Sequence, residues 1–341
     1  MVLKEDLERI VRDSNIDWER LRGARVLVTG ATGFIGSLCL RTLLAAKIPM
    51  QTVAMVRNRA KAELLFGDSV EYLVGDVREP LPSGEPFDYI IHCASNTSSR
   101  MMVEKPVDTL EISAAGTMRI LECAKESCAK SVVYVSSMEV YGITEERQNP
   151  VTENVLGYID VLNPRSSYSE GKRVSECLCA AFFNQYQVPV KIARLALTMG
   201  PGLPLTDNRV SMQFARSAIE GRNIVLHTKG QTVSNFCYVT DCIRGIFTVL
   251  LNGTSGEAYN ICNDAETRTI REIAELVANR IAGGAIRVVY DVPTENVFGY
   301  APDVVLRLCS DKLRNLGWKP DVGMEEAYHR LIRYIKESEM Q

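Results

Sequence analysis

The stretch Val26-Leu27-Val28-Thr29-Gly30-Ala31-Thr32-Gly33-Phe34-Ile35-Gly36 decides the fold of this chain. Its first four residues form a short apolar strand, and the glycines that follow open a helix. Glycines in this context allow a tight turn and close approach of the backbone to a pyrophosphate, whose charge the helix N-terminus stabilises. The alternative, an ordinary strand-to-helix turn, is disfavoured by the position in a first βαβ unit. The stretch therefore predicts a dinucleotide site contacted by Gly30, Thr32, Gly33, Phe34, Ile35 and Gly36.

Outward from this turn, short β-branched runs alternate with longer helical patterns. The predicted strands are Val26–Thr29, Thr52–Val56, Val70–Val74, Tyr89–His92, Val132–Ser136 and Val190–Leu195. Helical patterns lie at about 34–46, 59–66, 107–129 and 167–187, and a last helix runs from about Met324 to Lys336. Such alternation implies a parallel sheet covered by helices on both faces. The expected fold class is α/β, a Rossmann-type doubly wound parallel sheet with a smaller C-terminal substrate lobe.

The strand–helix rhythm also predicts the domain organisation. Residues 1–22 read as an N-terminal helical extension that precedes the main fold and packs against it. Residues 23–195 form the dinucleotide-binding domain, to which residues 237–264 return. Gly/Pro-rich loops and shorter mixed elements follow Leu195. We therefore assign residues 196–236 and 265–341 to a substrate-binding lobe that closes over the sheet edge.

The ends of the next three strands supply further candidate cofactor contacts. An acidic residue after the second strand accepts from the ribose 2′-hydroxyl of NAD, whereas an arginine accommodates the 2′-phosphate of NADP. Arg57 stands at this point, which favours NADP and leaves NAD open. Asp76 and Val77 after the third strand suit contact with the adenine, while Ala94 and Ser95 follow the fourth strand. Ligands of open α/β sheets bind at this carboxyl edge.

Tyr168 and Lys172 are four residues apart in a helical pattern, so both side chains lie on one helix face. An ammonium beside a phenol favours the phenolate and lowers the pKa of the tyrosine. A tyrosine tuned in this way takes a proton from an alcohol or returns one to a carbonyl. The spacing alone is common in helices, and its weight comes from the dinucleotide turn upstream. Together they predict hydride transfer at a carbinol carbon.

Composition excludes several classes of function. The chain has 46% hydrophobic and 24% charged residues with a net charge of −3, so no nucleic-acid partner is expected. No apolar run approaches the roughly 20 residues that span a bilayer, and the first residues do not resemble a signal peptide. We therefore expect a cytoplasmic protein without a membrane partner. The ten cysteines lack a C-x-x-C pair, which favours reduced thiols and predicts no metal site.

On these motifs the chain resembles the extended short-chain dehydrogenase/reductase family, the NAD(P)-dependent nucleotide-sugar epimerases and dehydratases. The resemblance covers about residues 24–320 and rests on GATGFIG (30–36), GDV (75–77), SSMEVYG (136–142) and YSEGK (168–172). It implies that Tyr168 is the catalytic acid/base, that Lys172 binds the nicotinamide ribose, and that Ser137 hydrogen-bonds the reacting hydroxyl. It also implies a tightly bound NADP or NAD, a sugar nucleotide or related small-molecule substrate, and a homodimer through helices 107–129 and 167–187.

The residues beside Ser137 bear on the reaction. The 4,6-dehydratases of the family resemble Thr-Asp-Glu there, and the UDP-glucuronate decarboxylases resemble Thr-Ser-Glu. This chain has Ser137-Met138-Glu139, and the thioether of Met138 cannot donate a proton. Glu139 either acts in acid/base chemistry or only hydrogen-bonds backbone. We expect an epimerase that works through a 4-keto intermediate. Alternatives are a nucleotide-sugar decarboxylase or 4,6-dehydratase, an NADPH-dependent reductase of a ketone or aldehyde, and a non-catalytic dinucleotide-binding protein.

The chain departs from the family pattern where the substrate is bound. Ser234 and Ala301 stand where the family carries arginines for the substrate diphosphate, and asparagines are replaced by Leu197 and Ser113. Charge-assisted bonds to phosphate are strong, so another cation is expected to replace them. The candidate cations are Arg209, Arg216 and Arg307, and the predicted substrate-binding residues are Thr97, Ser137, Arg209 and Arg307.

Overall fold

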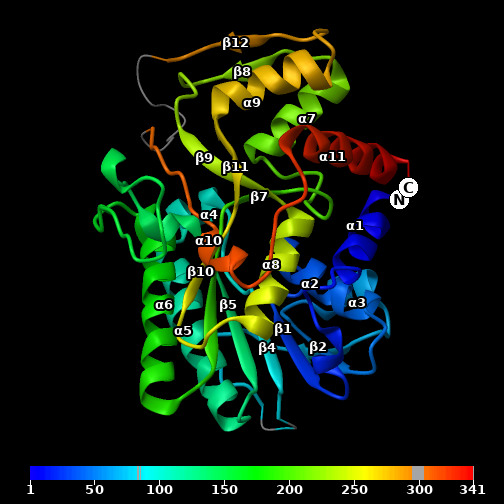
Figure 1. Ribbon diagram of the computed structural model, residues 1–341, viewed down its shortest axis with the longest axis vertical. Helices are drawn as coiled ribbons and strands as arrows, with labels where there is room; N and C mark the ends of the chain where they lie inside the picture. Colours follow the sequence, from blue (N-terminus) through cyan, green and yellow to red (C-terminus); the bar gives the residue numbers. More distant parts are fainter. Residues whose placement is uncertain (83, 85, 294–302, 341) are drawn as a thin grey trace.

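A twisted parallel sheet runs through the lower half of the molecule in Figure 1. The structure is a computed structural model that describes residues 1–82, 84, 86–293 and 303–340. Within these residues the sheet has seven strands in the order β10-β6-β5-β4-β1-β2-β3. They are β1 (Arg25–Thr29), β2 (Gln51–Val56), β3 (Glu71–Val74), β4 (Tyr89–His92), β5 (Ser131–Ser137), β6 (Val190–Leu195) and β10 (Ala258–Ile261). This is the predicted doubly wound α/β sheet.

Helices cover both faces of the sheet because its strands are apolar on both sides. Val26 and Val28 of β1 pack in one hydrophobic cluster, whereas Leu27 between them belongs to the cluster on the opposite face. One face is covered by α2 (Phe34–Ala45) and α8 (Val239–Asn252), the other by α5 (Pro106–Glu126) and α6 (Ser166–Tyr186). Continuous burial of this kind is typical of parallel strands.

A second group of elements lies beyond the carboxyl ends of the strands, in the upper half of Figure 1. It contains a three-stranded sheet and a two-stranded sheet within the described residues. Their strands are β7 (Leu197–Met199), β9 (Val233–Tyr238) and β11 (Asn263–Thr269), and β8 (Ile224–Leu226) and β12 (Val288–Tyr290). The helices here are α7 (Val210–Glu220), α9 (Ile270–Leu276) and α11 (Met324–Glu339). This arrangement places a lobe over the sheet edge where ligands are expected.

Most predicted elements agree with the structure to within a few residues, and the differences have local causes. The predicted helix 107–129 ends at Glu126 because Cys128 adopts a φ of +48°. The sequence did not reveal α4 (Ser99–Glu104) or the separate elements between Leu195 and the last helix, among them α8 and the edge strand β10. Short helices and short edge strands carry too few residues for a clear periodicity. In the described part of the chain, no helix combines the length and apolar character needed to cross a membrane.

The first helix, α1 (Val2–Val11), lies beside α11, so the two ends of the chain meet (Figure 1). Val2 N–H donates to Glu337 at 2.9 Å, and the buried Asp6 accepts from Tyr238 Oη at 2.7 Å and from Arg330. These contacts are made by a buried carboxylate with charged and hydroxyl donors, as its burial requires. The N-terminal extension is thereby attached to the second lobe through β9 and α11.

Arg244 of α8 joins three segments that are distant in the sequence. Its guanidinium contacts the carboxylates of Asp13, Asp241 and Asp321, and the side chains of Arg244 and Asp241 are 7% and 0% exposed. The other Asp241 oxygen accepts from the backbone N–H groups of Asp321 and Val322, each at 3.0 Å. The segment after α1, helix α8 and the segment before α11 are therefore fixed by one buried cation.

We expect Arg244→Met to lower the free energy of unfolding by about 3 to 5 kcal/mol, because it leaves buried carboxylates without their cation. Urea denaturation of the full chain measures this loss. The matched control is Arg271→Met, which removes a pair with Glu275 whose side chains are 59% and 42% exposed and should leave stability nearly unchanged. Equal effects of the two substitutions would contradict the assignment.

Candidate active site

Two glycines of the turn between β1 and α2 lie where there is no room for a side chain. Gly30 has a φ of +62°, and a Cβ there would lie 2.8 Å from the backbone nitrogen of Ala94. A Cβ on Gly36 would lie 2.3 Å from the carbonyl oxygen of Gly30. Gly33 precedes α2 as its N-cap, with Phe34 and Ile35 half-buried in the first turn and Thr32 half-buried before it. The turn therefore packs backbone against backbone and leaves the N-terminus of α2 open to a phosphate.

The end of β4 completes one side of this turn. Ala94 N–H donates to Thr29 Oγ1 at 3.1 Å, and Thr29 Oγ1 lies 2.7 Å from His92 Nδ1. Burial lowers the pKa of His92 to about 3, so its ring is neutral. Ser95 Oγ is buried and has no hydrogen-bond partner among the described residues. A buried hydroxyl without a partner is costly, and the hydroxyl and phosphate groups of a dinucleotide fit it.

Arg57, at the end of β2, is exposed, and its charge helps to lower the pKa of Asp76. Asp76 itself accepts two bonds from Arg78, with Nε–Oδ1 at 3.0 Å and Nη2–Oδ2 at 3.1 Å, and this pair is the main cause of its lowered pKa. Val77 is buried beneath Gly116 of α5. The adenosine end of the site thus carries two arginines, of which Arg78 is paired with Asp76.

Helix α6 and strand β5 bring Tyr168, Ser137 and Lys172 together. Tyr168 is 7% exposed and hydrogen-bonded by Ser137, the last residue of β5. Lys172 Nζ donates to the carbonyl oxygen of Val135 at 2.7 Å and lies 5.7 Å from the centre of the Tyr168 ring. Ser137 and Tyr168 are 31 residues apart in the sequence. They meet because β5 ends at Ser137 and the first turn of α6, which carries Tyr168, lies beside that end. A hydroxyl, a phenol and an ammonium therefore converge beside the glycine turn.

The pKa of Tyr168 differs from the sequence-based expectation. The pKa of Tyr168 is raised to about 12, chiefly by burial and also by the charge of Glu139, while Ser137, Arg165 and Arg209 act in the opposite direction. The expected lowering by Lys172 is wrong for the protein alone, because burial outweighs it and the ammonium is held by Val135. Burial also lowers the pKa of Lys172 to about 8. At neutral pH the phenol is protonated and the lysine largely charged.

Glu139 lies on the open side of Tyr168, held by residues that the sequence did not single out. The Arg165 guanidinium donates two hydrogen bonds to its carboxylate, Nη1–Oε2 at 3.0 Å and Nη2–Oε1 at 2.8 Å. Ser169 Oγ donates to Oε2 at 3.0 Å. Arg165 and Tyr168 are one helical turn apart, and this i, i+3 spacing was the available signal. The alternative that Glu139 only hydrogen-bonds backbone is wrong, because its partners are side chains beside the phenol.

Two departures from the family pattern touch each other. Ser234 Oγ donates to the sulfur of Met138 at 3.6 Å, and Ser234 is 1% exposed. Ser113 is buried in α5 and donates to Thr109 O, whereas Leu197 is 38% exposed at the start of β7. Ala301 lies outside the described residues. Two positions at which the chain departs from the family pattern, Met138 and Ser234, are therefore uncharged and in contact.

Of the three candidate cations for the substrate, Arg209 lies near the site. Its guanidinium is 5.4 Å from the centre of the Phe34 ring, and its charge acts on Tyr168. It is paired with Asp207 at 2.9 Å and precedes α7. Arg216 of α7 donates to the Leu205 and Asp207 carbonyls in the segment before this helix.

The two remaining predicted substrate residues lie differently. Arg307 pairs with Glu146 at 2.7 Å, and among the described residues no recorded contact joins it to Tyr168. Thr97 is exposed in the loop between β4 and α4. The structure thus brings Arg209 to the site, gives Arg307 another partner, and leaves Thr97 at the carboxyl edge of the sheet.

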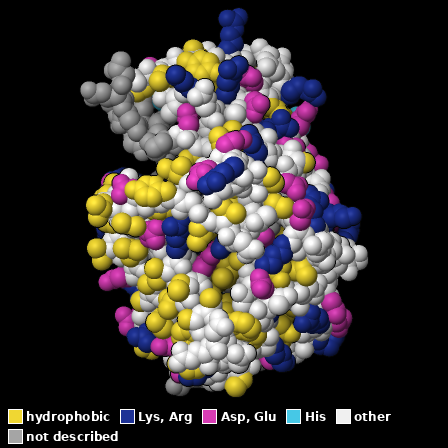
Figure 2. Space-filling view, turned by 60° about the vertical axis from the view of Figure 1, so that its left-hand side comes forward, with side chains coloured by type: hydrophobic (Ala, Val, Ile, Leu, Met, Phe, Trp, Pro, Cys, Tyr) yellow, Lys and Arg dark blue, Asp and Glu magenta, His cyan; other side chains and the backbone are white. Residues whose placement is uncertain are grey.

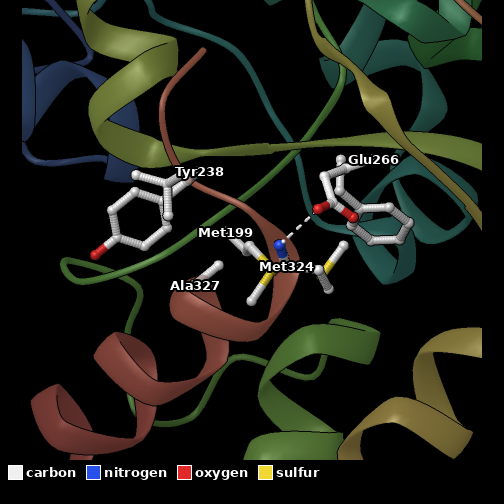
Figure 3. A pocket seen from close by; sticks show the side chains of 7 residues that line it. Met199, Tyr238, Glu266, Met324 and Ala327 are labelled. Atoms are coloured by element: carbon white, nitrogen blue, oxygen red, sulfur yellow. Dashed lines mark hydrogen bonds between the residues drawn. The ribbon is translucent and has the colours of Figure 1, made fainter.

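A small pocket in the second lobe is a separate feature (Figure 3). It is lined by Met199, Tyr238, Glu266, Met324 and Ala327, with Glu266 Oε1 accepting from Met324 N–H at 3.0 Å. Its volume of about 10 Å³ is that of one water at most. It cannot hold a substrate, and the chemistry belongs to the sheet edge.

Known proteins share both the sequence pattern and the fold. Residues 26–262 match the model of the NAD dependent epimerase/dehydratase family. UDP-glucuronic acid decarboxylase 1 of Xenopus tropicalis is 31% identical over 315 residues, which cover 92% of this chain and 72% of that protein. Among solved structures, an epimerase of Methanothermobacter thermautotrophicus has a TM-score of 0.80 at 22% identity, covering 96% of this chain and 97% of the other.

A second solved structure carries the cofactor. A double mutant of dTDP-glucose 4,6-dehydratase from Streptomyces venezuelae, with NAD bound, has a TM-score of 0.75 at 26% identity, covering 93% of this chain and 98% of the other. The predicted fold class is confirmed, and so is a nicotinamide dinucleotide as the cofactor.

We expect Gly36→Ala to weaken NAD binding at least about tenfold, a loss of about 1.4 kcal/mol, because the new Cβ would collide with Gly30 O at 2.3 Å. Titration calorimetry with NAD measures the change, and circular dichroism checks that the variant is folded. Gly84→Ala is the matched control, since nothing lies within 4 Å of a Cβ there. Unchanged affinity in folded Gly36→Ala would exclude this turn as the cofactor site.

Proposed function

The chain belongs to the NAD-dependent epimerase/dehydratase family, and we propose that it decarboxylates a nucleotide-linked uronic acid, with UDP-glucuronate as the first substrate to test. The proposal draws on the similarity to UDP-glucuronic acid decarboxylases over nine-tenths of the chain. These relatives favour the decarboxylase alternative over the epimerase that we expected from the sequence.

The residue beside Ser137 is the observation that carries this choice. A 4,6-dehydratase needs an acid there to expel water, and Met138 has none. Decarboxylation needs no such acid, because carbon dioxide leaves as a neutral molecule once a ketone stands β to the carboxylate. Oxidation of a uronic acid at C4 creates that ketone. Position 138 thus lacks an acid, and its Met138 sulfur instead contacts Ser234. This absence is compatible with decarboxylation and unfavourable for dehydration.

The chain's own residues supply the proton transfers. Tyr168 takes the proton of the C4 hydroxyl, while Ser137 hydrogen-bonds the same oxygen. The C5–C6 bond then breaks, its electron pair passes to the C4 carbonyl oxygen as an enolate, and carbon dioxide leaves. The neutral phenol of Tyr168 and the hydroxyl of Ser137 donate to the enolate oxygen. C5 takes a proton from water, and Tyr168 finally returns its proton to the C4 oxygen.

The cofactor would be held by the turn from Gly30 to Gly36, by Ser95 and by Lys172. When bound, the nicotinamide supplies reversible hydride transfer at C4 and, in its oxidised form, a positive charge that favours the phenolate of Tyr168. Asp76, Val77 and Ala94 line the adenosine and central parts of the same edge. The exposed Arg57 favours NADP over NAD. Retention of the cofactor between the two half-reactions follows from its restoration in each cycle.

The substrate diphosphate is assigned to Arg209 and the N-terminus of α7. Arg209 lies over Phe34 of the glycine turn and its charge acts on Tyr168, so it could reach a diphosphate attached to the reacting sugar. Its guanidinium is 45% exposed and therefore reachable. The helix N-terminus adds backbone donors to the charge. Thr97 is assigned to the sugar side of the cleft, and Arg307 to a peripheral contact of the lobe formed by residues 196–236 and 265–341.

We also propose that the chain forms a homodimer through α5 and α6. Figure 2 shows hydrophobic side chains on the face of the molecule that these helices turn outward. Val107 and Leu110 of α5 are 65% and 39% exposed, and Val174 of α6 is 43% exposed. A groove of about 480 Å³ between the helices is lined by apolar side chains such as Leu178 and Phe182 together with charged ones such as Glu122 and Lys125. An exposed apolar helix pair of this kind is suited to pairing with its own copy.

The activity is tested by incubating the protein with NAD and UDP-glucuronate and following release of carbon dioxide and the nucleotide product by mass spectrometry. We expect a UDP-pentose in equal amount to the carbon dioxide. Tyr168→Phe should lower the rate by about 10² to 10⁴ because proton transfer is lost, while NAD still binds. A product of unchanged mass, the C4 epimer, would instead support the epimerase, and a product lighter by one water a dehydratase.

For the homodimer, light scattering is expected to give about twice the chain mass of 37.9 kDa. The double substitution Val107→Glu and Leu110→Glu places charges on the proposed contact and should yield monomers. Val225→Glu, at a 46% exposed position of β8, is the matched control and should leave the mass unchanged. A monomeric wild-type chain would refute the assignment.

A further inference from the structure

Two arginine–glutamate pairs flank helix α6, and they differ in exposure. Arg194 and Glu176 are 8% and 10% exposed, and Glu176 also accepts from Ser136 at 2.6 Å. This pair ties α6 to β5 and β6 and is closed to solvent. Arg165 and Glu139 are 33% and 34% exposed. Because about one third of each side chain is exposed, a ligand can reach this pair from solvent.

The open pair lies where the sugar must be. Arg165 is the N-cap of α6, one helical turn before Tyr168, and its charge acts on the phenol. Lys172, by contrast, is buried against Val135 on the sheet side. A substrate whose C4 hydroxyl meets Tyr168 therefore has Lys172 on its cofactor side and Arg165 on its open side.

We propose that Arg165 binds the carboxylate of an acidic sugar substrate, which takes the place of Glu139 on the guanidinium. The inference rests on the proposed function and names the group that selects its substrate. A guanidinium holds a carboxylate through two parallel N–H bonds, the geometry that Arg165 already makes with Glu139 at 3.0 and 2.8 Å. The neighbouring Met138–Ser234 pair is uncharged, and Arg209 is already assigned to the substrate diphosphate. Arg165 is thus the cation best placed for a carboxylate attached to the ring.

Glu139 makes the exchange reversible. When Arg165 turns to the substrate, Glu139 keeps the hydroxyl of Ser169, which donates at 3.0 Å. When the carboxylate leaves as neutral carbon dioxide, Glu139 is at hand to pair the guanidinium again. An arginine left without a counter-charge would oppose this loss. Glu139 then supplies the counter-charge of Arg165, and the site returns to its state before the substrate bound.

The test compares binding of UDP-glucuronate and UDP-xylose, the pentose that remains when carbon 6 is lost, to the NAD-loaded full chain by calorimetry. Tyr168→Phe serves as the background so that no turnover occurs. In this background, Arg165→Gln should weaken UDP-glucuronate at least tenfold and change UDP-xylose less than about twofold, since only the former carries the carboxylate. Glu139→Gln should strengthen UDP-glucuronate relative to UDP-xylose, because it removes the competing carboxylate. Arg271→Gln, which breaks an exposed pair in the second lobe, is the control.

The opposite effects expected of Arg165→Gln and Glu139→Gln on UDP-glucuronate binding distinguish ligand exchange from a purely structural role of the pair. If Arg165→Gln and Glu139→Gln weaken both ligands alike, the pair only supports the helix end and the inference is overturned. It is also overturned if the preference for UDP-glucuronate persists in Arg165→Gln, whereas carbon dioxide release by the wild-type chain would then still sustain the proposed function. If neither nucleotide binds the wild-type holoenzyme, the proposed function falls and this inference with it.

Discussion

The close packing of α6 against α5 and β5 is the constraint on which the site depends. A Cβ on Gly171 would lie 2.8 Å from Ser113 Oγ, so only a glycine lets the two helices approach this far. The approach buries Tyr168 and Lys172 and brings the ammonium within 2.7 Å of Val135 O. It also brings Glu176 to Arg194 and Ser136. The positions of the reacting groups therefore follow from helix packing and not from flexible loops.

Burial governs the electrostatics of this arrangement. It raises the pKa of Tyr168 to about 12 and lowers that of Lys172 to about 8, in each case because the charged form loses water. The neighbouring charges of Glu139, Arg165 and Arg209 act on the phenol with mixed signs. A protonated phenol is the form that donates to a carbonyl oxygen, and the charge of the oxidised cofactor is the element that favours its ionisation. The protein and the cofactor thus each support one direction of proton transfer.

Two departures from the family pattern are neighbours in the tertiary structure. Met138 and Ser234 are 96 residues apart and touch each other, so one contact accounts for two sequence differences. Arg209 lies over the Phe34 ring, a placement that no motif revealed. Arg165 and Glu139 form a charged pair near Tyr168, whereas Met138 and Ser234 form an uncharged contact. This difference is the basis for proposing a substrate with one carboxylate near the reacting carbon.

The sequence by itself determined the α/β fold, the glycine turn and the Tyr168–Lys172 face, because these depend on local spacing. Strand and helix periods span only a few residues, and a four-residue interval on a helix defines a face. Only the tertiary structure decided which distant residues meet. It paired Arg165 with Glu139 across 26 residues, brought Ser234 to Met138, and turned Arg307 to Glu146. It also reversed the expected pKa shift of Tyr168, since desolvation is a property of packing that neighbouring sequence does not record.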